Sequence, residues 1–109
     1  MARSQTARSN GLRSVQQGAV RQDFRLRRQI EDATASVMAN VAGGFDSGSD
    51  AEFIRLLGYA RRSASEVQSH LYIALDRGYV TEEEFEAICQ KAVQVKKLIS
   101  GFIRYLRQS

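Results

Sequence analysis

The chain has 109 residues, of which 43% are apolar and 26% charged, and it contains neither proline nor tryptophan. This length suits one domain with a single hydrophobic core. No run of about 18 uncharged apolar residues occurs and the basic start lacks an apolar stretch, so neither a membrane span nor a secretory signal is expected. Cys89 is the only cysteine, which excludes an internal disulfide and favours a reducing, cytoplasmic compartment.

The net charge of +4 is unevenly distributed along the chain. Residues 1–28 carry seven arginines and one acidic residue, a net charge of +6. Residues 29–109 carry nine lysines and arginines against eleven acidic residues, a net charge of −2. A basic end of this kind either contacts polyanions or forms a solvated tail, and composition alone leaves both readings open.

Residues 1–22 are rich in arginine, serine and glutamine and poor in large apolar residues. Leu12, Val15 and Ala19 have helical spacing, but two glycines in this stretch weaken the pattern. We predict that residues 1–22 form a basic N-terminal arm that is largely disordered or weakly helical. The bundle domain is predicted over residues 23–109.

A helical apolar pattern begins near Phe24 and predicts a first long helix over residues 24–43. Gly43 and Gly44 are expected to end this helix, because glycine readily adopts the left-handed C-cap conformation. The stripe recurs in steps of four and three residues and comprises Leu26, Ile30, Ala33, Val37, Asn40 and Gly44.

Two capping boxes predict the starts of two further helices, over residues 50–77 and 82–107. In the first box Ser49 precedes Glu52 by three residues, and in the second Thr81 precedes Glu84. Gly78 is the expected C-cap between the two helices. The second stripe comprises Phe53, Leu57, Ala60, Ala64, Val67, Leu71 and Ala74, and the third Phe85, Ile88, Ala92, Val95, Ile99, Phe102 and Leu106.

Three long amphipathic helices joined by short loops must run antiparallel to their neighbours. Their apolar stripes have a period near 3.5, which is typical of left-handed bundle packing. We therefore predict an all-α fold, an antiparallel up-down helical bundle of three long helices plus a short or degenerate first helix.

Several segments occur in an order and spacing that is typical of one bacterial family. The segment Ala39–Phe45 reads Ala-Asn-Val-Ala-Gly-Gly-Phe, and residues 49–57 read Ser-Asp-Ala-Glu-Phe-Ile-Arg-Leu-Leu. Ala60, residues 63–66 (Ser-Ala-Ser-Glu), the pair 78–79 (Gly-Tyr) and the triplet 81–83 (Thr-Glu-Glu) follow. With these segments, residues 24–107 resemble the four-helix-bundle proteins of the 23S rRNA intervening-sequence family.

The resemblance implies a scaffold-like bundle without catalytic activity, often a ring-shaped homo-oligomer and commonly a pentamer. A similar fold occurs in the accessory variability proteins that assist the reverse transcriptases of retroelements. The resemblance thus connects this chain with nucleic acid by analogy, although a fold does not determine a function.

Asn40 lies on an otherwise apolar stripe, where a buried amide needs hydrogen-bonding partners. We expect a polar core network in which Asn40 pairs with Ser63 or Glu66 of the next helix. Such a network either lines a site or fixes the register of the helices, as a lone asparagine does in a coiled coil, and the second reading is favoured.

No constellation of catalytic or metal-binding residues is apparent. His70 is the only histidine, and Glu66 is the only metal-binding side chain at a helical spacing from it. Neither a Ser–His–Asp arrangement, nor paired catalytic carboxylates, nor a phosphate-binding glycine loop can be assembled. We therefore expect no enzyme, no cofactor and no metal site, and we interpret Cys89 as a small core residue.

Arginines supply the candidate site. We expect these arginines either to contact phosphates or to form a solvated face. No aromatic stacking platform lies beside them in the sequence, so we do not expect them to read a base sequence. The expected partners are further copies of this chain and RNA, DNA or a nucleic-acid enzyme; the alternative is a protein–protein adaptor that binds no nucleic acid. The candidate phosphate-contacting residues are Arg13, Arg21, Arg25, Arg27, Arg28, Arg61 and Arg62.

Overall fold

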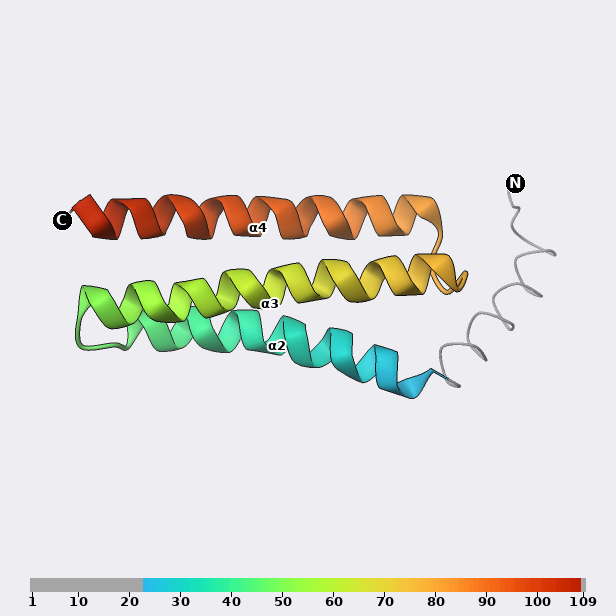
Figure 1. The fold of residues 1–109 in the computed structure, drawn as a ribbon, viewed down its shortest axis with the longest axis horizontal. Helices are drawn as coiled ribbons and strands as arrows, with labels where there is room; N and C mark the ends of the chain where they lie inside the picture. Colours follow the sequence, from blue (N-terminus) through green and yellow to red (C-terminus); the bar gives the residue numbers. More distant parts are fainter. Residues whose placement is uncertain (1–22, 109) are drawn as a thin grey trace.

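The computed structural model describes residues 23–108, which form three long antiparallel helices (Figure 1). They are α2 (Phe24–Phe45), α3 (Asp50–Asp76) and α4 (Glu82–Gln108). The predicted all-α, up-down arrangement of three helices is confirmed, with each helix end within two residues of its predicted position. The predicted arm and short first helix in residues 1–22 lie outside the described residues. Within those that are described, no helix is both long and apolar enough to cross a bilayer.

The pair Gly43 and Gly44 does not end α2, as the sequence suggested, because the helix continues through both glycines to Phe45. Gly44 is buried, and a Cβ atom placed there would lie only 2.5 Å from Cδ1 of Phe53 on α3. Glycine at this position therefore permits a close helix–helix approach. The turn that follows is closed by Ser47, whose hydroxyl and backbone N–H both donate to the carbonyl of Gly44, at 2.6 and 3.1 Å.

The ends of α3 are capped largely as predicted. The hydroxyl of Ser49 accepts the backbone N–H of Glu52 at 3.1 Å, but the carboxylate of Glu52 pairs with Arg55 at 2.6 Å. At the other end Gly78 has a φ of +75°, the only positive φ in the described chain, and its N–H donates to the carbonyl of Leu75. This left-handed residue turns the chain towards α4.

The second capping box forms completely at the start of α4. The backbone N–H of Thr81 donates to the carboxylate of Glu84 at 2.8 Å, and the N–H of Glu84 donates to the Thr81 hydroxyl at 3.0 Å. Three glutamates occupy the first turn, where the positive end of the helix dipole stabilises them.

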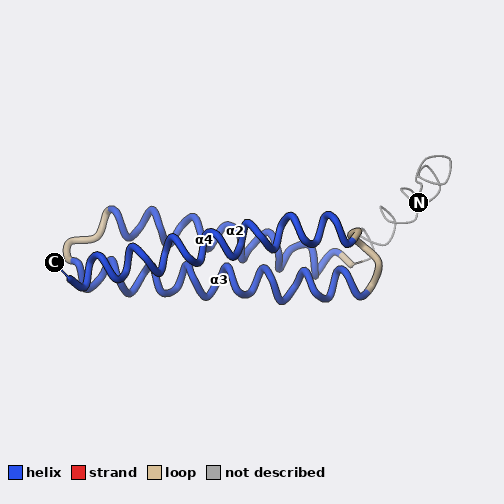
Figure 2. Tube along the Cα trace, turned by 90° about the horizontal axis from the view of Figure 1, so that it is seen from above, coloured by secondary structure: helices blue, strands red, loops and turns tan. Residues whose placement is uncertain are grey.

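Helix α3 lies between the other two helices and packs against both. No Cα atom of α2 lies within 8 Å of a Cα atom of α4, although both helices are fully described. Seen from above in Figure 2, α2 and α4 overlap and α3 lies below them. No described helix therefore packs against both α2 and α4 on the side opposite α3.

Side chains of all three helices meet in the core on either side of the middle of α3. One cluster is centred on Leu57, Ala60 and Ile99, and the other on Val67, Leu71 and Phe85. Leu57 is only 2% exposed and Ala60 is inaccessible, as the apolar stripe predicted. Burial of a leucine of this kind contributes about 1.5–3 kcal/mol, so these stripes carry much of the stability of the bundle.

Three aromatic rings, one from each of the three helices, meet beside the α2–α3 turn. The ring centroids of Phe45 and Phe53 are 4.9 Å apart, and those of Phe53 and Phe102 are 5.1 Å apart. Phe45 also meets Phe102 edge-on at 5.8 Å. The end of α2 thus contacts α4 through side chains alone.

Asp23 ties the start of α2 to the end of α3. Its carboxylate accepts the backbone N–H of Leu26 at 3.3 Å and the hydroxyl of Tyr79 at 3.0 Å, and it also pairs with the guanidinium of Arg77. Burial acts to raise the pKa of Asp23, but the hydrogen bonds from Tyr79, Leu26 and Arg77 outweigh it and hold that pKa below its ordinary value. Burial and the hydrogen bond to Asp23 together raise the pKa of Tyr79.

Candidate functional site

A strongly basic feature of the described chain is an open groove between α3 and α4. The groove has a volume of about 670 Å³, and the residues lining it include five cations and no acidic residue. We call it the basic groove. Its lining residues are Gly58, Arg61, Arg62, Ser65, Lys96, Lys97, Ser100 and Arg104.

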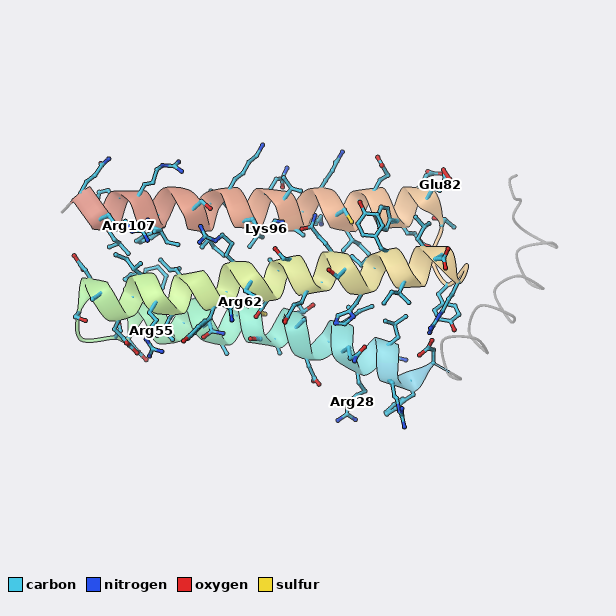
Figure 3. All side chains as sticks on the ribbon, viewed as in Figure 1. Arg28, Arg55, Arg62, Glu82, Lys96 and Arg107 are labelled. Carbon is cyan, nitrogen blue, oxygen red and sulfur yellow. The ribbon has the colours of Figure 1, made fainter. Side chains whose placement is uncertain are left out.

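Helical periodicity brings these side chains to one surface. On α3 the lining positions recur every three or four residues from Gly58 to Ser65, and on α4 they recur in the same way from Lys96 to Arg104. Figure 3 shows Arg62 on α3 and Lys96 on the neighbouring α4, above it in that view. Gly58 and the two serines are small, so they leave the floor of the groove open between the longer cationic chains.

Neutral hydroxyl groups, not carboxylates, hold two of these cations in place. Arg61 donates from Nη1 to Oγ of Ser100 at 3.0 Å, and Lys96 donates from Nζ to Oγ of Ser65 at 3.3 Å. Each of these bonds crosses from one helix to the other. They fix the positions of the charges without neutralising them.

The ion pairs among residues 23–108 all lie elsewhere, at Arg27, Arg55 and Arg77. Arg62 instead lies over the ring of Tyr59, 5.7 Å from its centroid, and this cation–π contact leaves its charge uncompensated. Several like charges without local counter-charges produce a positive potential that attracts polyanions.

The structure separates the predicted arginines into distinct groups. Arg61 and Arg62 lie in the basic groove, whereas Arg25, Arg27 and Arg28 lie on the first turns of α2. Arg28 projects from α2 away from α4 (Figure 3) and lies 5.4 Å from the ring centroid of Phe24. Arg27 is paired with Glu31 at 3.2 Å, and both side chains are exposed. The remaining two candidates, Arg13 and Arg21, lie outside the described residues.

Sequence reasoning missed the α4 half of the groove, namely Lys96, Lys97 and Arg104. The spacing of seven residues between Lys97 and Arg104 places them on one face, and that signal was present in the sequence. The sequence does not say which helix lies beside the face of Lys97 and Arg104, and only the packing of α4 on α3 shows it.

The expected direct pairing of Asn40 with Ser63 or Glu66 is not seen, and both Asn40 and Ser63 bond to Ser36 instead. The amide nitrogen of Asn40 donates to the carbonyl and the hydroxyl of Ser36 on its own helix, at 2.9 and 3.1 Å. Ser63 of α3, which is buried, donates its hydroxyl to Oγ of Ser36 at 2.9 Å. Glu66 is exposed and does not join these hydrogen bonds. Ser36 is therefore the link between Asn40 and Ser63.

The remaining chemically reactive side chains do not assemble into a site. Burial, followed by the charge of Glu86, raises the pKa of the Cys89 thiol and so disfavours the reactive thiolate. Nδ1 of His70 is buried and has no hydrogen-bond partner among the described residues. In the part of the chain that the structure describes, no three His, Cys, Asp or Glu side chains are grouped to hold a metal ion.

The fold and the groove together define a helical-bundle protein with one cationic face. The family model of the 23S rRNA-intervening sequence protein matches residues 4–101. The chain belongs to this family, and the match extends into residues 4–22, which the structure does not describe.

A solved structure shares this fold. It is the crystal structure of a protein of unknown function from the S23 ribosomal protein family of Bacteroides thetaiotaomicron. The two chains are 26% identical and superpose with a TM-score of 0.75, over 83% of this chain and 85% of that one. No curated protein matches the chain.

Proposed function

We propose that this protein is a non-catalytic helical scaffold that binds the phosphate backbone of nucleic acid through the basic groove. The observation that supports the proposal is the convergence of five cations from two helices on one groove whose lining contains no carboxylate. Phosphate contacts of this kind provide affinity and position without reading sequence. The names of the matched family and of the Bacteroides relative's family, which refer to 23S rRNA and to ribosomal protein, favour RNA as the ligand.

The geometry of the groove suits a phosphate chain better than a small anion. Its cations are distributed along both helices, and Lys97 and Arg104 alone are separated by about 10 Å along α4 at 1.5 Å per residue. Successive phosphates of one stacked strand are spaced about 3.4 Å along the helix axis, so several phosphates fit along the groove. The arginines of residues 1–28 extend the same positive charge, as an additional and less specific contact.

Two double variants of α4 test the proposal directly. Lys97→Gln with Arg104→Gln removes two groove cations, and Lys91→Gln with Arg107→Gln removes the same two residue types from exposed positions outside the groove lining. Fluorescence anisotropy with a labelled oligonucleotide at low salt should show weaker binding for the groove variant and nearly unchanged binding for its matched control. Equal affinities for the two variants would refute the assignment of the groove.

A shortened chain separates the groove from the N-terminal arm. Removal of residues 1–22 leaves Asp23 and the whole of α2 intact, so the bundle keeps its first cap. We expect the shortened protein to bind more weakly but to retain the difference between the two double variants. Complete loss of binding would place the contact on the arm instead.

The proposal includes self-association through the uncovered side between α2 and α4. Met38 on α2 and Leu98 on α4 are 69% and 74% exposed, values that are high for large apolar side chains. Met38 lies two helical turns before Phe45, and Leu98 lies one turn before Phe102, so both border the side on which these two rings meet. A second copy of the chain is the proposed cover, and the family resemblance implies a ring of five.

A protein–protein adaptor without nucleic-acid binding is the second candidate, and the same exposed apolar side chains favour it. The absorbance ratio at 260 and 280 nm of protein purified at low salt distinguishes the two candidates. A raised ratio that falls after nuclease treatment supports the nucleic-acid scaffold. A ratio typical of pure protein, together with a protein partner of fixed stoichiometry, supports the adaptor.

A further inference from the structure

The basic groove continues along the same face of α3 and α4 into a second groove of different chemistry. This second groove has a volume of about 490 Å³, and it shares Lys97 with the basic groove. We call it the aromatic groove. Its lining residues are Gln68, Tyr72, Phe85, Glu86, Cys89, Gln90, Val93, Gln94 and Lys97.

Tyr72 is an exposed ring in a fixed position within this groove. It is 62% exposed, yet its ring is held edge-on against the buried ring of Phe85, with centroids 4.8 Å apart. Phe85 is anchored in the core cluster around Val67 and Leu71. An aromatic face that is exposed and already ordered suits the stacking of a nucleobase, because every base has a π-face.

The other polar groups of the aromatic groove suit bases better than phosphates. Three glutamines lie around Tyr72, and their amides can both donate to and accept from base edges. Glu86 is the only charged residue in the lining besides Lys97, and its carboxylate repels phosphates from that end. The basic groove therefore suits phosphates, and the aromatic groove that continues from it suits bases.

From these observations the geometry points to single-stranded nucleic acid as the ligand, with phosphates along the basic groove and an unpaired base on Tyr72. This inference rests on the function proposed above and specifies its ligand. From Gly58 to Tyr72 the two grooves extend about 21 Å along α3, room for about six nucleotides of a stacked strand. A duplex presents its phosphates to the groove but keeps its bases paired and stacked, so it contacts the cations without using Tyr72.

The test compares a labelled twelve-nucleotide oligoadenylate with a duplex of the same length, on the full chain. Tyr72→Leu should weaken binding of the single strand about tenfold and leave duplex binding unchanged, since one stacked base contributes on this scale. Tyr72→Phe should behave like the unaltered protein, and Tyr72→Trp should tighten binding of the single strand. Tightening cannot arise from a loss of folding. Tyr105→Leu, on an exposed position outside both grooves, is the matched control.

The outcomes separate this inference from the proposal beneath it. If the Lys97→Gln, Arg104→Gln variant weakens binding but Tyr72→Leu and Tyr72→Trp leave the single strand unaffected, the basic groove stands and the single-strand assignment is overturned. Equal or tighter binding of the duplex also overturns it. If neither nucleic acid responds to the loss of the two cations, the proposed function itself fails.

Discussion

Replacement of Gly44 by alanine tests how closely α2 and α3 must approach. The added Cβ would lie 2.5 Å from Cδ1 and 2.7 Å from Cε1 of Phe53, well inside van der Waals contact. The Phe53 ring cannot move away freely, because it is packed against the rings of Phe45 and Phe102. Overpacking of this kind costs about 1–3 kcal/mol.

The neighbouring glycine provides a matched control. A Cβ at Gly43 would meet only Cδ1 of Leu56, at an ordinary distance of 3.6 Å. Both substitutions gain helix propensity of about 1 kcal/mol, since both positions lie within α2. The gain cancels in the comparison, so Gly44→Ala should be less stable than Gly43→Ala by the overpacking cost alone, about 2 kcal/mol.

Thermal unfolding followed by circular dichroism measures this difference. For a domain of this size, about 1 kcal/mol corresponds to roughly 4–8 °C in Tm, so the two variants should differ by roughly 10 °C. Phe53→Leu in the Gly44→Ala background should recover part of the loss, because it removes the ring atoms that clash. If Gly44→Ala proved as stable as Gly43→Ala, the close approach of the two helices would be wrong.

Three further outcomes follow from contacts in the bundle. Asp23→Asn should lower the free energy of unfolding at neutral pH, and urea titrations should show this loss shrinking below about pH 4. The pKa of folded Asp23 lies below its ordinary value of 3.8. The ionised carboxylate therefore stabilises the fold above pH 3.8, and this stabilisation is lost as the pH falls through the folded pKa. Ser63→Ala should cost about 1 kcal/mol in the free energy of unfolding, since it removes the hydroxyl that links α3 to Ser36; an unchanged urea midpoint would show that this bond is dispensable. Leu98→Glu should dissociate the assembly in analytical ultracentrifugation without lowering the helix content, and an assembly of unchanged mass would exclude the α2–α4 side as its contact surface.

The fold was largely predictable from the sequence, because apolar periodicity and capping residues act locally. The stripe through Leu57 and the box at Thr81 and Glu84 correspond to a buried residue and to a pair of reciprocal hydrogen bonds. The error at Gly44 arose because a helix-ending glycine and a close-packed glycine look alike until the partner helix is placed. Phe53, ten positions beyond the end of the predicted helix, supplies the close contact that requires a glycine at position 44.

The candidate site was predictable only in part. Arg61 and Arg62 are adjacent in sequence and were recognised as a basic pair, but Lys97 and Arg104 complete their groove from another helix. Tyr72 was similarly inconspicuous, because its role depends on Phe85, which holds the ring at the groove, and on Lys97, which joins the two halves. Residue spacing specifies faces of single helices, whereas a groove between two helices depends on how those faces meet.

The salt dependence of nucleic-acid binding is the most direct measurement of whether the basic groove contacts phosphates. Each phosphate contact contributes about 0.7 to the slope of log affinity against log salt for a single strand and about 0.9 for a duplex. Loss of Lys97 and Arg104 together should therefore reduce the single-strand slope by roughly 1.4, while loss of Lys91 and Arg107 leaves it unchanged. Identical slopes for the unaltered protein and both double variants, or binding that does not respond to salt, would contradict the account.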